Sequence, residues 1–183
     1  MNHIGTKDLE TDRLILRRIT VNDAEQMYNN WASNPIVAKY TTWQAHKDVD
    51  ETKKLLEIWE SEYENKECYR WCIVLKDENK PIGTIDVCKS NERLEFAEIG
   101  YCIAQDCWGK GIVTEAGKKV IEFLFNEVGY NRIQAKYMPV NIASGKVMQK
   151  LGMQYEGIQR EAYKDNNGNF CDIAVYSILK REF

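Results

Sequence analysis

The sequence predicts a single domain of mixed α/β architecture spanning residues 1–183. Three observations support this. A chain of 183 residues can bury a core of its own but is short for two ordinary domains. Segments with strand-like alternation are interleaved with segments of helical spacing. In the middle of the chain, short polar turns join the strand-like segments, which is typical of an antiparallel meander.

Composition and charge narrow the class of protein. Hydrophobic residues make up 44% of the chain, which is too many for a disordered protein, and the net charge of −3 gives no reason to expect nucleic-acid binding. No leader pattern opens the chain and no run approaches about 18 apolar residues, so we expect a cytoplasmic protein without a membrane span.

The six cysteines form no Cys-x-x-Cys pair and are expected to be free, mostly buried thiols. The two histidines, His3 and His46, lie near no cysteine pair, so no metal site is expected.

The first half of the chain predicts a strand over residues 13–19 and two helices. The first helix should begin near Thr20–Asp23 and end at Asn34-Pro35. Apolar positions mark the second over residues 52–63. Its other face is acidic, which predicts either a solvated surface or a wall that attracts a cationic acceptor; the residues concerned are Glu51, Glu57, Glu60, Glu62 and Glu64.

The second half predicts the meander, a long helix, and then a strand, a helix and a closing hairpin. The last strand is apolar, which fits a place inside the sheet or pairing across a homo-oligomer equally well. The expected ranges are strands 70–75, 82–88 and 94–103, helix 111–129, strand 132–137, helix 141–152, and strands 153–163 and 170–179.

Two segments are candidates for chemistry. Residues 98–116 combine a strand, the turn Gly109-Lys110-Gly111 and a helix start, where free N–H groups bind phosphate oxygens. The glycine spacing matches neither a Walker A loop nor a dinucleotide fingerprint. Taken alone, a tight turn explains it as well. The second segment, Asn141–Ser144, opens the next helix, where Asn141 as an N-cap and Ser144 as a surface residue are the ordinary reading.

In combination the two segments resemble the GNAT superfamily of acyl-CoA-dependent N-acyltransferases. Within it they resemble the branch of the ribosomal-protein alanine N-acetyltransferases (RimJ/RimL-like). The resemblance runs from Leu9 to Arg181 and is strongest over residues 97–101, 108–116, 141–144 and 150–153. The superfamily pattern Gln/Arg-x-x-Gly-x-Gly/Ala falls on residues 108–113, where Gly111 matches and Trp108 and Val113 depart from it.

The resemblance implies a mostly antiparallel sheet of six or seven strands, splayed between strands 4 and 5 and flanked by about four helices. It implies acetyl-CoA as cosubstrate and no metal. The pantetheine arm would pair with the strand at Tyr101, Cys102 and Ile103, with Asn141 and Ser144 also contacting the cofactor. Gly100 within this strand indicates a bulge or, equally, a packing constraint; a bulge would free the N–H of Tyr101 or Cys102 for the thioester oxygen. The pyrophosphate would bind the amides of Gly109, Lys110, Gly111, Ile112, Val113 and Thr114.

The transfer needs a neutral amine, a stabilised oxyanion and a proton for the thiolate. Glu98 is the expected base, acting through one water, and Glu161 is a second candidate. Ser144 is expected to donate to the sulfur. An ion-paired strand carboxylate and an ordinary surface hydroxyl are the alternatives for Glu98 and Ser144. A covalent route through Cys102 or Cys107 lacks a histidine partner.

The acceptor amine stays open at this point. An α-amino group has a pKa of about 7.7–8.0 against about 10.4 for lysine, so a weak base favours a protein N-terminus, with ribosomal proteins among the candidates. The alternatives are a small amine (a polyamine, an amino sugar or an aminoglycoside) and a CoA-binding interaction module without catalysis.

Overall fold

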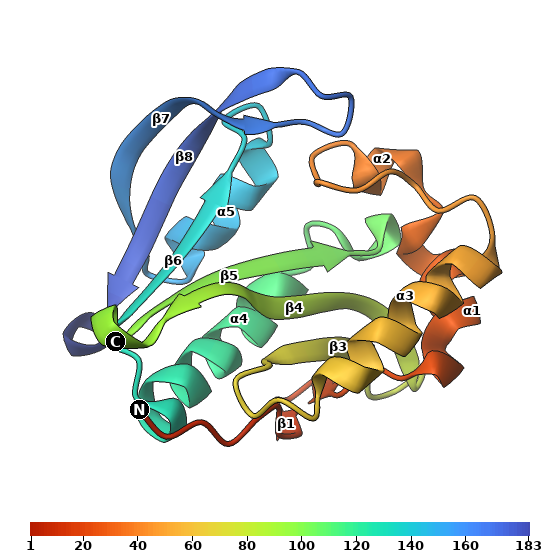
Figure 1. Ribbon diagram of the computed structural model, residues 1–183, viewed down its shortest axis with the longest axis horizontal. Coiled ribbons are helices and arrows are strands. Elements are labelled where there is room, and N and C mark those ends of the chain that lie inside the picture. Colours follow the sequence, from red (N-terminus) through yellow and green to blue (C-terminus); the bar gives the residue numbers. More distant parts are fainter.

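A sheet of eight strands crosses the molecule in the spatial order β1-β2-β3-β4-β5-β6-β8-β7 (Figure 1). The computed structural model describes residues 1–183. The strands are β1 (Leu9–Glu10), β2 (Leu14–Arg17), β3 (Arg70–Leu75), β4 (Lys80–Asn91), β5 (Phe96–Ile103), β6 (Arg132–Tyr137), β7 (Gln154–Lys164) and β8 (Phe170–Leu179). The helices are α1 (Ala24–Met27), α2 (Pro35–Ala38), α3 (Val49–Glu62), α4 (Ile112–Phe123) and α5 (Ile142–Lys150).

The predicted mixed α/β class is confirmed, and the counts differ slightly. The sheet has eight strands because β1, two residues long, pairs with β2 and is too short to show a periodicity. There are five helices because Asn34 caps a separate short α2, in which Pro35 is the first residue. The first helix also continues past α1 as a π-helical turn over Tyr28–Ala32.

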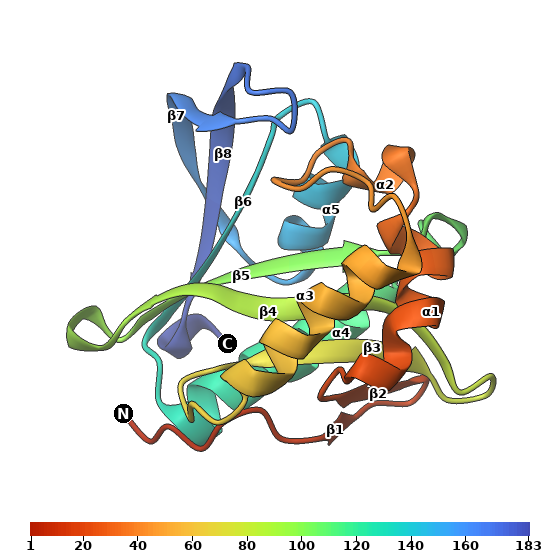
Figure 2. The same cartoon turned by 45° about the vertical axis from the view of Figure 1, so that its right-hand side comes forward.

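The helices cover both faces of the sheet. Figures 1 and 2 place α1 and α3 on one face and α4 on the other. One continuous core includes Trp71 of β3, and Phe123 of α4 meets its ring edge-on at 5.7 Å. The apolar β8 lies between β6 and β7, inside the sheet, which accounts for its composition. No helix is long and apolar enough to cross a membrane, and all six cysteines are free.

The one parallel pairing in the sheet is short. β5 and β6 pair only from Phe96 opposite Arg132 to Glu98 opposite Gln134. Beyond Glu98 the two strands diverge, with β5 running on beside β4 and β6 turning away towards β8 (Figure 1). The carboxyl half of β5 therefore has a free edge facing the gap.

The bulge considered at Gly100 is wrong, because the extra residue lies on the neighbouring strand. Cys88 of β4 is inserted where Val87 pairs with Ile99 and Lys89 pairs with Glu98. Gly100 stays in register opposite Asp86. A Cβ on Gly100 would lie 3.4 Å from Oδ1 of Asp86, which is a van der Waals distance.

The close contact of β4 and β5 requires a glycine at position 83. A Cβ there would lie 2.3 Å from the carbonyl oxygen of Cys102. We therefore expect Gly83→Ala to lower the free energy of unfolding by about 1–3 kcal/mol, since the backbone of β5 has to move. Chemical denaturation measures this. The control Lys89→Ala, at an exposed position of the same strand, should change stability by less than about 0.5 kcal/mol. Equal stability of the two variants would contradict the packing.

Candidate active site

The turn before α4 presents a row of unpaired backbone amides. Gly109 and Gly111 have φ angles of +74° and +73°, a conformation that costs side-chain-bearing residues free energy. The N–H groups of residues 109–114 have no acceptor within the protein, and the first bonded amide is that of Glu115, which donates to Gly111. A Cβ on Gly109 would meet nothing within 4 Å, so the loop is open to a ligand. Six free amides at a helix start suit an anion such as a diphosphate.

An ion pair from the N-terminal strand region holds this loop in place. Arg13 donates from Nε to Glu115 at 2.7 Å and from a terminal nitrogen to the carbonyl oxygen of Lys110 at 3.1 Å. The hydroxyl of Thr11 donates to the other oxygen of Glu115 at 2.5 Å. Burial raises the pKa of Glu115, but the hydrogen bonds from Thr11 and Arg13 outweigh it and leave the pKa lowered. Nothing local to residue 13 in the sequence indicates this ion pair, because its partner lies 102 positions away.

The free edge of β5 offers alternate amides to the gap. Ala104 donates to Ile82 of β4, and antiparallel strands alternate their N–H groups between the two sides. The N–H of Tyr101 lies beyond the last position paired with β6 and therefore faces the gap, whereas that of Cys102 faces β4. The carbonyl oxygen of Ile103 already accepts from the indole N–H of Trp108 at 3.1 Å.

A cavity of about 190 Å³ lies where β5 and β6 separate. Glu98 and Lys136 contribute charged groups to this cavity. Oε2 of Glu98 lies 3.1 Å from Nζ of Lys136. The same oxygen accepts from Gln134 at 2.6 Å, while Oε1 has only the thiol of Cys88, at 4.0 Å. One carboxylate oxygen is thus held and the other is available to a ligand. The lining residues are Tyr40, Cys88, Glu98, Ile99, Gly100, Lys136, Tyr137, Met138, Gln159, Ala162, Tyr163 and Ile173.

Two hydroxyl groups meet on the α5 side of the gap. The side chains of Tyr101 and Ser144 lie 2.9 Å apart, and Tyr101 also approaches the carbonyl oxygen of Ser144 at 3.1 Å. Burial raises the pKa of Tyr101 to about 12, so its hydroxyl stays protonated. Asn141 occupies the N-cap position of α5, but its side chain makes no capping hydrogen bond. The side-chain amide of Asn141 is therefore free for another partner.

Other candidates lie outside this arrangement. Glu161 is exposed, sits in a bulged part of β7 and does not line the cavity. The acidic residues of α3 do not line it either. Among them, Glu60 accepts from the backbone of Val21 and Glu62 pairs with Arg70. No cluster of His, Cys, Asp or Glu is arranged to hold a metal ion.

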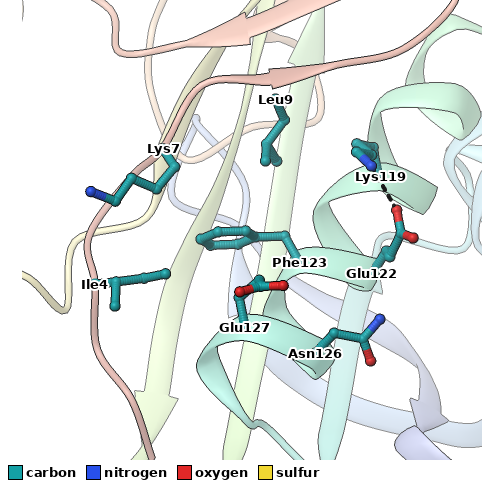
Figure 3. Close-up of a pocket in the computed structure, with 8 residues that line it drawn as sticks. All are labelled: Ile4, Lys7, Leu9, Lys119, Glu122, Phe123, Asn126 and Glu127. Carbon is teal, nitrogen blue, oxygen red and sulfur yellow. Dashed lines mark hydrogen bonds and ion pairs between the residues drawn. The ribbon is translucent and has the colours of Figure 1, made fainter.

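A larger hollow of about 350 Å³ lies elsewhere, between the N-terminal segment and α4 (Figure 3). Phe123 extends from α4 towards the N-terminal segment (Figure 3). The charged lining groups are balanced, with Lys7 and Lys119 against Glu122 and Glu127. None of the predicted site residues lines it.

The geometry agrees with the comparisons to known proteins. A family model described as "Acetyltransferase (GNAT) domain" matches residues 13–154. The chain belongs to the GNAT acetyltransferase family. It is 36% identical over 172 residues to the uncharacterized N-acetyltransferase YoaA of Bacillus subtilis strain 168, a match that covers 94% of this chain and 96% of YoaA.

Two solved acetyltransferase structures have the same fold as this GNAT enzyme. The ribosomal-protein-S5-alanine acetyltransferase of Vibrio fischeri has a TM-score of 0.83 at 25% identity, covering 95% of this chain and 97% of that one. The microcin C7 self immunity acetyltransferase MccE, solved with acetyl-CoA and AMP, also has a TM-score of 0.83 at 25% identity, with 92% and 93% covered. The resemblance noted in the sequence is confirmed, and the protein is an N-acetyltransferase.

The amide loop of this GNAT enzyme gives a direct test with CoA. Gly111→Val should weaken CoA binding at least about ten-fold in a calorimetric titration, since a branched side chain disfavours a positive φ and crowds the amides. Gly129→Val is the matched control. It lies just beyond the other end of the same helical segment, has a φ of +94° and has open space around it. Both variants should lose stability, but only the first should lose affinity; equal CoA affinity in the two would contradict this role.

Proposed function

We propose that this enzyme transfers the acetyl group of acetyl-CoA to the N-terminal α-amine of a protein by direct attack in a ternary complex. The observation that carries the proposal is the placement of Glu98. It lies at the point where β5 and β6 separate, with one free oxygen in the cavity that residues of both strands line. Acetyl-CoA would supply an activated acyl group there, with its diphosphate on the amides of residues 109–114.

The residues present fit the two charges that the reaction develops. Glu98 can take the proton of the incoming ammonium group through its free oxygen, directly or through one water. The N–H of Tyr101, on the free edge of β5, is placed to donate to the thioester oxygen as negative charge builds on it. Of the two amides considered from the sequence, the orientation supports Tyr101 over Cys102.

Ser144 is the proposed donor to the departing sulfur. Its hydroxyl lies 2.9 Å from that of Tyr101, so the hydrogen bond between them orients the Ser144 hydroxyl. Asn141, with no capping bond to make, is available to the pantetheine arm beside it.

The state of the cysteines supports direct transfer over an acyl-cysteine route. The surrounding protein desolvates the thiols of Cys88 and Cys102 and, with nearby carboxylates, raises the pKa of each to about 12. A neutral thiol is a poor nucleophile. Neither histidine lines the cavity.

The charges that line the cavity indicate which kind of acceptor amine it can hold. Glu98 and Lys136 are its only charged lining residues, so their charges cancel and a polycation finds no acidic wall. Asn166, at the β7–β8 turn, donates to the carbonyl oxygen of Ala38 at 3.1 Å and accepts from Gln44, so that hairpin is joined to the α2 region. Such a site suits a single amine on a slender, extended chain. The S5-alanine acetyltransferase among the structural neighbours is named for a substrate of that kind.

Release of CoA from acetyl-CoA with an acceptor panel tests the proposal. Peptides with a free N-terminus should react, and the same peptides with a blocked N-terminus and an internal lysine should not, because the lysine amine is harder to deprotonate. Turnover of a polyamine, amino sugar or aminoglycoside without turnover of any peptide would overturn the acceptor assignment.

Replacing the base should affect chemistry and spare binding. Glu98→Gln is expected to lower kcat by about 10²-fold or more, because general-base catalysis contributes 10²–10⁴-fold. CoA affinity should stay unchanged. Glu161→Gln, at the exposed second candidate, is the control and should retain wild-type kcat. The assignment fails if the two variants behave in the opposite way.

The two hydroxyl groups should act as one unit. Tyr101→Phe and Ser144→Ala should each lower kcat, and the double variant should lose little more than Ser144→Ala alone, because the two side chains share one hydrogen bond. Steady-state kinetics of all four proteins gives the coupling energy. Fully multiplicative losses would mean that the two hydroxyls act independently.

A further inference from the structure

A row of polar side chains on β6 holds the inner oxygen of Glu98. Gln134 donates from Nε2 to Oε2 of Glu98 at 2.6 Å, and Lys136 lies 3.1 Å from the same oxygen. Behind Gln134, Arg132 donates to its Oε1 at 3.2 Å. Arg132 in turn pairs with Glu156 of β7 through two bonds of 2.7 and 2.6 Å. The bonds form a continuous chain from Glu156 near the surface to the cavity.

The chemistry of this chain fixes which way the Gln134 amide points. An arginine side chain only donates hydrogen bonds, so the amide oxygen of Gln134 has to face Arg132. The amide nitrogen then has to face Glu98. Arg132 is itself held by Glu156, whose hydrogen bond raises the pKa of Arg132, and by the hydroxyl of Ser177 at 2.7 Å. Gln134 is thus a donor aimed at Glu98 and cannot exchange its two ends without losing a bond to Arg132.

Burial and strand register stabilise this contact in the folded protein. Gln134 is 9% exposed and Ser177 is 4% exposed, so water competes weakly for their hydrogen bonds. Gln134 lies directly opposite Glu98 in the last paired position before β5 and β6 diverge. The contact therefore sits where the sheet opens, and a carboxylate oxygen bonded there is not free to rotate into the cavity.

We propose that Gln134 is a positioning residue for the base: oriented by Arg132, it binds Oε2 of Glu98 and leaves Oε1 directed at the acceptor amine. The inference rests on the proposed role of Glu98 as base and states which residue orients its carboxylate for that role. Lys136 supplies a second donor to the same oxygen from beyond the last paired position. The other titratable groups facing Glu98 are the thiol of Cys88 on β4 and the hydroxyl of Tyr163 on β7.

Two substitutions of Gln134 distinguish the effect of its hydrogen bond to Glu98 from the effect of its side-chain size. Gln134→Leu removes the donor and should lower kcat about ten-fold with the KM for acetyl-CoA unchanged, as expected for a lost hydrogen bond to a charged group. Gln134→Glu keeps the shape and the bond to Arg132 but brings a second carboxylate against Glu98. Like charges at that distance cannot both remain ionised, so one proton is retained between them.

The deciding readout is the titration of Glu98 itself. Carbon-13 NMR of the glutamate carboxyl groups, with Glu98→Gln used to assign the signal, gives its midpoint. In Gln134→Glu we expect the shared proton to titrate at least about one pH unit above Glu98 in the wild type. Gln154→Glu is the matched control: Gln154 also donates to a glutamate, Glu182, at 3.2 Å on the exposed surface. It should leave both the Glu98 midpoint and kcat unchanged.

A third variant keeps the test informative if Gln134 proves necessary for folding. Arg132→Met acts from outside the contact, at a position where the side chains of Arg132 and Glu156 are 26% and 39% exposed. It should lower kcat in the same direction as Gln134→Leu, by a smaller factor. Wild-type kcat in Gln134→Leu, or an unmoved Glu98 midpoint in Gln134→Glu, would overturn the inference. An active Glu98→Gln variant would instead overturn the proposed function beneath it.

Discussion

The short parallel pairing of β5 with β6 is the constraint on which the site depends. Three paired positions join the two strands, and the last of them sets Glu98 opposite Gln134. If the pairing continued, the amide edge of β5 would be used up in the sheet and no cavity would form. If it were absent, nothing would hold Glu98 beside its donors. The site exists because the strands stay together long enough to fix the carboxylate and then separate.

Much of the fold follows from periodicity in the sequence. The predicted ranges for β3, β6 and β8 coincide with the observed strands, because β3 and β8 are largely apolar runs, β6 alternates polar and apolar residues, and polar turns bound all three. The glycine in β5 indicates a bulge or a packing constraint at Gly100, but the bulge lies at Cys88 on β4. A Cβ at Gly100 would meet the side chains of Asp86 and Cys88 only at van der Waals distance. Which strand carries an extra residue depends on pairing that a single sequence does not display.

The residues of the site likewise fall into two groups: those that a local sequence pattern predicts and those that only the tertiary structure brings together. The glycines before α4 and the hydroxyl of Ser144 are recognisable locally, because a helix start and its first turn are written in consecutive residues. The residues that hold the site in place are not. Arg13 reaches Glu115 from the far end of the chain, and Gln134 meets Glu98 only through the register of the parallel pair. An ordinary glutamine in a strand carries no sign of such a role.

The structure of the protein with bound CoA tests the central claim most directly. The account predicts a diphosphate hydrogen-bonded to the amides of residues 109–114, a pantetheine arm along the free edge of β5, and a sulfur between Ser144 and the cavity that Glu98 lines. CoA seated instead in the hollow beside Phe123, or bound with the gap between β5 and β6 left empty, would contradict it.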